Sequence, residues 1–194
     1  MMNYKTMNKI MEKRMYFFVP YNISPIQQAI QAGHSSLEYA RKYGDTELFK
    51  DFVDNHKTWI ILNGGTTNSH SKPNSDYRID TEPYIGSLNN IAHQLTMNNI
   101  DYSLFNEPDL NDSLTAVCFI ADERVFNKKD YVDFVNFLLK EITDEEKVSF
   151  ILINSKDINI LKENFPIEYN DWIDTIGGHK NEFLRELIRN KKLA

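Results

Sequence analysis

The chain has a single cysteine and no long hydrophobic run, and each lack excludes a class of protein. Cys118 is the only cysteine among 194 residues, so no disulfide can form within the chain. No metal-ligand spacing surrounds Cys118, and its setting in TAVCFIA suits a small buried side chain. The longest apolar runs, such as AVCFIA, are far shorter than the roughly 18 residues that a membrane-spanning helix requires.

The N-terminal residues lack the pattern of a secretory leader. The stretch MMNYKTMNKIMEKRMYFF contains Lys and Arg, but no continuous apolar segment followed by small residues. We therefore expect a cytoplasmic protein with no membrane partner. With 41% hydrophobic and 12% aromatic residues, the chain can bury a core, as one main domain with an appendage.

Negative charge is concentrated in the middle of the chain. Residues 16–126 carry seven Lys/Arg against fourteen Asp/Glu, a net charge of −7. A protein that grips a phosphate backbone usually carries the opposite sign over its core domain. The sequence therefore predicts weak or absent tRNA binding. Four basic residues near the N-terminus could form a separate RNA-binding arm: Lys5, Lys9, Lys13 and Arg14.

The order of the expected elements predicts an α/β fold. Strand-like runs and helical patterns alternate along the chain, and the last two strand-like runs follow each other directly. We expect a small mixed, mostly parallel sheet flanked by helices, followed by a helical extension. The expected parts are a flexible N-terminal segment 1–14, an α/β domain 15–142 with a long loop at 66–83, and the extension 143–194.

The first expected helix begins after Ser24, a good N-cap, with Pro25 at the first helical position and Gln27 completing a capping box. Five small or apolar residues recur at helical spacing: Ile26, Ile30, Gly33, Leu37 and Ala40. We expect this stripe to pack on the sheet, with Gly33 permitting close approach. The polar stripe of Gln27, Gln31 and His34 is then either a solvated face or the edge of a binding site.

Part of the chain resembles a known enzyme family. The stretch AIQAGHSS resembles the Ala-x-Gln-x-x-His pattern in the first helix of the archaeal and eukaryotic type (class II) of peptidyl-tRNA hydrolase. Three further stretches follow in the order of that family: TWIILNGG, HQLTMNNIDYSLFNEP and DSLTAV. The resemblance covers residues 15 to about 126. It implies a small α/β fold, hydrolysis of an ester linked to tRNA, and catalytic positions at Thr115 and at Glu107 or Asp109.

One departure from the family changes the expected chemistry. The position of the family's functional lysine holds Gln27, and no lysine occurs between Arg14 and Arg41. An ammonium at that position could stabilise charge that develops on an ester carbonyl or a leaving oxygen. An amide can donate a hydrogen bond but supplies no charge. Whether the protein is an enzyme therefore stays open.

The strand ends predict where a site would lie. In a sheet whose first three strands run in one direction, the loops after their carboxyl ends converge, and ligands usually bind there. A helix N-terminus at the same edge suits a phosphate or carboxylate, and the long loop could fold over it as a lid. No metal or cofactor is expected. The expected ligand-binding residues are Ser24, Gln27, Gln31, His34, Asn63, Gly64, Gly65 and Arg78.

Each candidate also has a purely structural explanation. Gln27 fits a capping-box partner of Ser24, and His34 fits a histidine held by a structural hydrogen bond. Glu107 and Asp109 lie in a polar turn, where solvated acids are common, and the β-branched Thr115 belongs in a strand in any case. The Asn63-Gly64-Gly65 stretch is too short to identify a phosphate loop.

Two functions are compatible with these observations. The first is a binding protein on a hydrolase-like fold that holds a nucleotide-like or other small anionic ligand. The richness in Asn and Lys would suit a phage or an AT-rich bacterium, so a phage protein that sequesters a host signal nucleotide is a specific form of it. The alternative is a hydrolase of peptidyl-tRNA or a related ester. The extension 143–194 is expected either to pack on the domain or to form a homo-oligomer.

Overall fold

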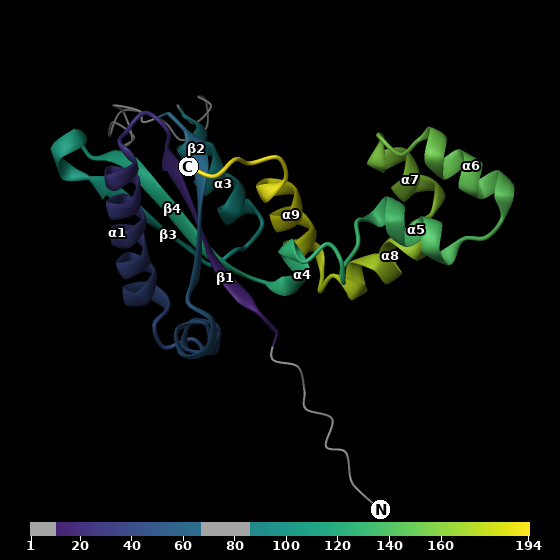
Figure 1. The fold of residues 1–194 in the computed structure, drawn as a ribbon, viewed down its shortest axis with the longest axis horizontal. Coiled ribbons are helices and arrows are strands. Elements are labelled where there is room, and N and C mark those ends of the chain that lie inside the picture. The colour runs from purple at the N-terminus through teal and green to yellow at the C-terminus, as the bar shows by residue number, and fades with distance from the viewer. Residues whose placement is uncertain (1–10, 67–85) are drawn as a thin grey trace, which may run out of the picture. The chain divides into compact units, whose positions relative to one another are not determined.

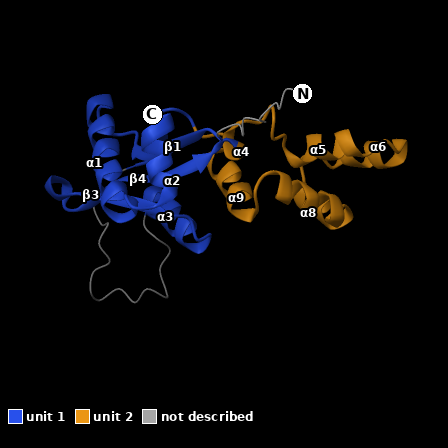
Figure 2. Cartoon of the chain, turned by 90° about the horizontal axis from the view of Figure 1, so that it is seen from below, with its two compact units in different colours: residues 1–123, 192–194 blue, residues 124–191 orange. Residues whose placement is uncertain are grey.

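The computed structural model describes residues 11–66 and 86–194, and the chain divides into two compact units. Unit 1 comprises Met1–Glu123 and Lys192–Ala194, and unit 2 comprises Arg124–Lys191 (Figure 2). The predicted fold class, α/β with a mixed sheet and C-terminal helices, is confirmed. Within the described ranges no helix is both long and apolar enough to cross a bilayer.

Unit 1 is built on a four-stranded sheet with the order β2-β1-β4-β3 (Figure 1). The strands are β1 (Lys13–Pro20), β2 (Thr58–Gly65), β3 (Tyr102–Glu107) and β4 (Ser113–Asp122). β1 is parallel to β2 and antiparallel to β4, and β3 is antiparallel to β4. Three strands therefore run in one direction, although only one neighbouring pair is parallel. Their carboxyl ends meet the start of β4 at one edge of the sheet.

β1 begins slightly earlier than expected. Lys13 and Arg14 pair with Asp122 and Ala121 of β4, so the end of the segment expected to be flexible belongs to the sheet. Residues 1–10 lie outside the described residues, as does the expected long loop except for residue 66.

The two central strands are covered on both faces, which explains their continuous apolar runs. Met15, Phe17 and Val19 belong to a core cluster that also includes Tyr39 of α1 (Pro25–Tyr43). Leu88 of α3 (Ser87–Met97) lies on the other face, where it packs close to Gly64. Figure 1 shows α1 and α3 on opposite sides of the sheet. Alternate residues of β1 thus face different helices.

The side of α1 that packs on the sheet is the opposite of the one we expected. Ile26 is 75% exposed and Leu37 is 69% exposed, so the apolar stripe does not pack on the sheet and that expectation is wrong. The buried residues of the helix are Gln28, Gln31, Ala32, Ser35 and Tyr39. Small side chains bring the helix close to the sheet, and polar ones are buried because they have partners. Gln28, for example, donates to the Pro20 carbonyl at 3.0 Å.

Shorter elements complete unit 1. They are α2 (Glu47–Asp51), the π-helix η1 (Phe52–His56), the 3-10 helix η2 (Pro108–Leu110) and the start of α4 (Glu123–Phe126). The C-terminal residues return to pair with β2. The Asn63 N–H donates to the Lys192 carbonyl at 2.9 Å, and the Ala194 N–H donates to the Ile61 carbonyl at 3.0 Å. This pairing covers part of an otherwise open strand edge.

Unit 2 is a helical body with its own core. Its helices are α5 (Phe134–Glu141), α6 (Glu145–Ile153), α7 (Ile158–Asn164), α8 (Pro166–Thr175) and α9 (His179–Ile188). We expected α5 to close the α/β domain, with a boundary after residue 142. Instead Phe134 and Leu138 of α5 share a core with Ile151, Leu161 and Trp172, so the unit begins at residue 124. Many apolar residues of the extension are therefore buried within unit 2, although Ile153 and Ile167 are 81% and 73% exposed.

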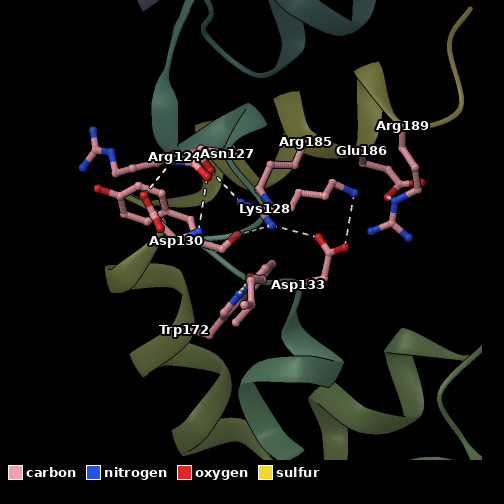
Figure 3. Close-up of polar contacts among 11 residues, drawn as sticks. Arg124, Asn127, Lys128, Asp130, Asp133, Trp172, Arg185, Glu186 and Arg189 are labelled. Atoms are coloured by element: carbon pink, nitrogen blue, oxygen red, sulfur yellow. Dashed lines mark hydrogen bonds and ion pairs between the residues drawn. The ribbon is translucent and has the colours of Figure 1, made fainter. Parts of the chain in front are cut away.

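A buried arginine joins the irregular start of unit 2 to its last helix. Arg185 is 3% exposed and donates to the carbonyls of Arg124 at 2.6 Å and Tyr131 at 2.8 Å. It also donates to Asp133 Oδ1 at 2.8 Å. Figure 3 shows Arg185 and Asp133 directed toward each other, with Trp172 nearby. One guanidinium thus fixes three points of a segment with little regular structure.

Burial alone would raise the pKa of Asp133, but hydrogen bonds and charge from Arg185 and Lys128 outweigh it, and the pKa is lowered. The charged carboxylate is therefore the form that the fold stabilises.

A second polar cluster joins α7, α8 and α9. Glu182 accepts hydrogen bonds from Lys162 Nζ and Tyr169 Oη, both at 2.7 Å, and lies 3.1 Å from His179 Nδ1. Burial would raise the pKa of Glu182, but these hydrogen bonds and the Lys162 charge outweigh it and hold the pKa below 4.5, its ordinary value. The ionised carboxylate therefore contributes to the stability of unit 2.

We expect Glu182→Gln to lower the stability of unit 2 at neutral pH by about 1 kcal/mol. A lowered folded-state pKa means that the contribution is present above the unfolded pKa and is lost as pH falls through the folded one. The gap between variant and wild type should therefore close below about pH 4 in thermal unfolding followed by circular dichroism. Glu186→Gln is the control, because its pair with Arg189 is exposed. A gap that stays constant down to about pH 2 would contradict the charge-based explanation.

Candidate functional site

The carboxyl ends of the strands gather the candidate residues at one edge of unit 1. Pro20 of β1 pairs with Gly65 of β2, and Glu107 of β3 pairs with Ser113 of β4. The Tyr21 N–H donates to the Gly65 carbonyl at 2.8 Å, which ties the loop after β1 to the end of β2. α1 starts at the same edge, as expected for an α/β site.

Three expected site residues form one hydrogen-bonded chain at this edge. Gln31 Nε2 donates to Glu107 Oε2 at 2.6 Å, and Thr115 Oγ1 donates to Gln31 Oε1 at 2.6 Å. The residues come from α1, the end of β3 and the start of β4. Gln31 is 6% exposed and Thr115 is fully buried. The structure thus brings together residues that lie up to 84 positions apart in the sequence.

The chain of hydrogen bonds defines what each group can do. The Thr115 hydroxyl is buried and directed at Gln31, so it cannot attack a substrate from its present position. Gln31 is held at both ends of its amide, which fixes the side chain. Glu107 is half-buried, and among the described residues its second oxygen, Oε1, has no hydrogen-bond partner. That oxygen can accept a hydrogen bond from a ligand, and the bonds through Gln31 hold the carboxylate in place.

His34 lies one turn after Gln31 but does not join this chain. Its ring packs on Phe105, with ring centroids 4.4 Å apart. Its Nδ1 is buried and has no hydrogen-bond partner in the described part of the protein, so the expected structural hydrogen bond is not seen. We did not anticipate Phe105. The two-residue spacing of Ser103, Phe105 and Glu107 along β3 was the signal that they share a face.

Ser24 and Gln27 are engaged with each other. The Gln27 N–H donates to Ser24 Oγ at 3.3 Å, and the Ser24 N–H donates to Gln27 Oε1 at 3.0 Å. Pro25 has no N–H to offer. Most of the donors that an anion would use at this helix N-terminus are therefore already satisfied, and the capping role of Gln27 is the one that the structure contains.

The Asn63-Gly64-Gly65 stretch has structural duties. Asn63 Oδ1 accepts from the Gly65 N–H at 2.8 Å. A Cβ on Gly64 would collide with the Leu88 side chain, and one on Gly65 would collide with Ser87. The glycines therefore allow α3 to approach β2 closely.

The remaining candidates stand apart from the hydrogen-bonded chain. Asp109 lies in η2 and is exposed, and Arg78 lies outside the described residues. In residues 11–66 and 86–194, no three His, Cys, Asp or Glu side chains are placed to hold a metal ion. Cys118 is buried as expected, and burial raises its pKa to about 11, which keeps the thiol protonated and inert.

The fold and the edge site define an α/β protein with a mixed four-stranded sheet and a separate helical unit. No protein-family model matches the chain, and no curated protein matches it in sequence. The resemblance to class II peptidyl-tRNA hydrolases therefore remains a proposal.

Proposed function

We propose that the chain is a binding protein for a nucleotide-like ligand that lies at the carboxyl edge of the sheet. The observation that carries this proposal is the hydrogen-bonded chain through Thr115, Gln31 and Glu107, which supports an acceptor without exposing a nucleophile. A ribose hydroxyl or an exocyclic amine of a base can donate to Glu107. A phosphate would be repelled by the same carboxylate, so the anionic part of the ligand points away from it.

Among the described residues no cation is placed beside the hydrogen-bonded chain, which favours binding over hydrolysis. Ester hydrolysis develops negative charge that a cation or several aimed donors must stabilise. The position of the lysine in the resembling family holds Gln27, whose amide oxygen caps Ser24. Thr115 is buried as well. The described residues therefore supply neither an ammonium nor an exposed hydroxyl to the hydrogen-bonded chain of Thr115, Gln31 and Glu107.

One observation favours peptidyl-tRNA hydrolysis as the second candidate. The acid at the end of β3 and the threonine near the start of β4 are the two polar positions that the resemblance implies, and both contact Gln31. A polar set of this kind is what a hydrolase with an altered mechanism would retain. The fold alone does not decide between the two functions.

Native mass spectrometry of protein purified from its natural host tests the binding proposal. We expect a retained small molecule in the wild type, its loss in Glu107→Ala, and its retention in the control Asp109→Ala, because Asp109 is exposed in η2 outside the hydrogen-bonded chain. If none is retained, equilibrium dialysis with adenosine and guanosine monophosphates follows. No retained molecule and no binding up to about 1 mM would overturn the proposal.

A peptide-release assay separates the two functions. We expect the purified protein to release no peptide from a model peptidyl-tRNA, because the position of the lysine in the resembling family holds Gln27. Gln27→Lys restores the charge and is expected to give a trace of activity. Gln27→Met, which has a similar length but no charge, is the control. Turnover by the unchanged protein at about 1 per second or faster would reject the binding proposal in favour of the hydrolase.

A further inference from the structure

The apolar stripe of α1 is left uncovered by the described residues of unit 1. Ile26 is 75% exposed, Ile30 is 47% exposed and Leu37 is 69% exposed. Gly33 lies between them, and a Cβ built on it would meet no atom of the described chain within 4 Å. Three large apolar side chains around an open notch on one helix face are typical of a surface that another molecule covers.

The spacing of the stripe makes it complementary to itself. Its members are four, three and four residues apart, so the pattern reads the same in both directions. In an antiparallel pair of α1 helices with a two-fold axis midway between positions 31 and 32, Ile26 faces Leu37 of the second copy. In the same register Ile30 faces Gly33 of the second copy, where the missing side chain leaves room for it.

Charge also favours a second copy over a different partner. Residues 21–37 contain no Asp, Glu, Lys or Arg, in a chain that is 26% charged and has a net charge of −6. Two copies, although both carry a net negative charge, can thus approach along this stripe without like charges facing each other. Antiparallel helix dipoles add a favourable term.

We propose that α1 is the interface of a two-fold symmetric homodimer, formed by Ile26, Ile30, Gly33 and Leu37 of both copies. The opposite face of α1 holds Gln31, which stays in its hydrogen-bonded chain, so dimer formation is independent of the proposed ligand. One helix face is smaller than the roughly 1,600 Å² of a standard interface. The dimer therefore dissociates in the micromolar range, unlike an obligate one.

Sedimentation velocity of the full chain from about 1 to about 100 µM tests the interface. We expect a concentration-dependent dimer whose dissociation constant rises at least ~30-fold in Ile30→Glu. The control is Ile153→Glu, because Ile153 is 81% exposed in unit 2 and should leave the dimer unchanged. Gly33→Leu fills the notch and improves helix propensity, so it should remove the dimer while the fold is retained. A monomer at all concentrations, or a dimer that neither stripe variant affects, would overturn the proposal.

A disulfide experiment tests the antiparallel register. Oxidation should convert the double variant Ile26→Cys/Leu37→Cys into a covalent dimer, because the two positions face each other across the axis. Ile26→Cys alone should stay uncrosslinked, since the two copies of position 26 are about 16 Å apart along the helices. Crosslinking of the single variant, or none of the double variant, would reject this register. A single Ile30→Cys that resists a maleimide in the monomer would show that another part of the same chain covers the stripe, and would also overturn the proposal.

Discussion

Replacing Arg185 by methionine should unfold unit 2 under conditions in which the wild-type unit is folded. The guanidinium is 3% exposed and donates to two carbonyls and to Asp133. Methionine fills much of the same volume but leaves a partly buried carboxylate without its main partner, so we expect a loss of about 3–5 kcal/mol. Thermal unfolding followed by circular dichroism measures the loss. Hydrogen exchange should locate it in residues 124–191.

Two further variants show whether the loss comes from the arginine's hydrogen bonds. Arg189→Met removes an exposed arginine whose pair with Glu186 is solvated, so it should change stability by less than about 0.5 kcal/mol. Asp133→Asn in the Arg185→Met background should recover part of the loss, because it removes the unpaired charge. An unchanged unfolding midpoint in Arg185→Met would show that Arg185 does not hold unit 2 together.

The sheet could be predicted from the sequence because its central strands are buried on both faces. Such strands appear as short unbroken apolar runs, as in the FFV of β1 and the AVCFIA of β4. The start of α1 was also readable, because a capping box depends on residues three positions apart. Both signals are local, and both are confirmed.

The orientation of α1 could not be predicted by the same reasoning. Hydrophobic periodicity measures how apolar a face is, but not whether polar side chains on the other face will find partners. Gln28 and Gln31 are buried because they have hydrogen-bond partners on the strands. Gln28 donates to the Pro20 carbonyl, and Gln31 donates to the Glu107 carboxylate and accepts from the Thr115 hydroxyl. Those partners are set by the fold, so a single helix sequence does not contain them.

The extent of unit 2 also depends on contacts between residues that are far apart in the sequence. The apolar face of α5 was visible in the sequence, but nothing in the helix says which core it joins. The pairing of Lys192 and Ala194 with β2 involves three residues without a periodic pattern. At the candidate site, the resemblance predicted both Glu107 and Thr115, whereas the contact of Phe105 with His34 is seen only in the structure.

Replacing Gln31 by leucine should cost unit 1 about 2–4 kcal/mol, although leucine is the more favourable residue for burial. The change removes two hydrogen bonds of 2.6 Å and leaves the buried Thr115 hydroxyl without its amide acceptor. Leucine retains the helix propensity of glutamine, so the loss reports the hydrogen bonds. Chemical denaturation followed by the fluorescence of Trp59, which lies in β2, measures it. Gln27→Leu is the control on the same helix. It should cost less than about 1 kcal/mol, because it removes only one partner of an exposed capping box.

A double-mutant cycle then decides whether Thr115 and Gln31 act as one unit. Thr115→Val alone leaves the buried Gln31 oxygen without its donor, so it should be clearly destabilising. In the Gln31→Leu background the same change removes a hydroxyl that has already lost its main partner, and it should cost about 1 kcal/mol less. The single hydroxyl proton of Thr115 also approaches the Phe105 carbonyl at 3.3 Å, and that carbonyl can accept it in the Gln31→Leu background. The coupling energy therefore reports the Gln31 bond relative to this weaker alternative. Additive losses would mean that the two side chains do not interact. The rigid support for Glu107, on which the binding proposal depends, would then be absent.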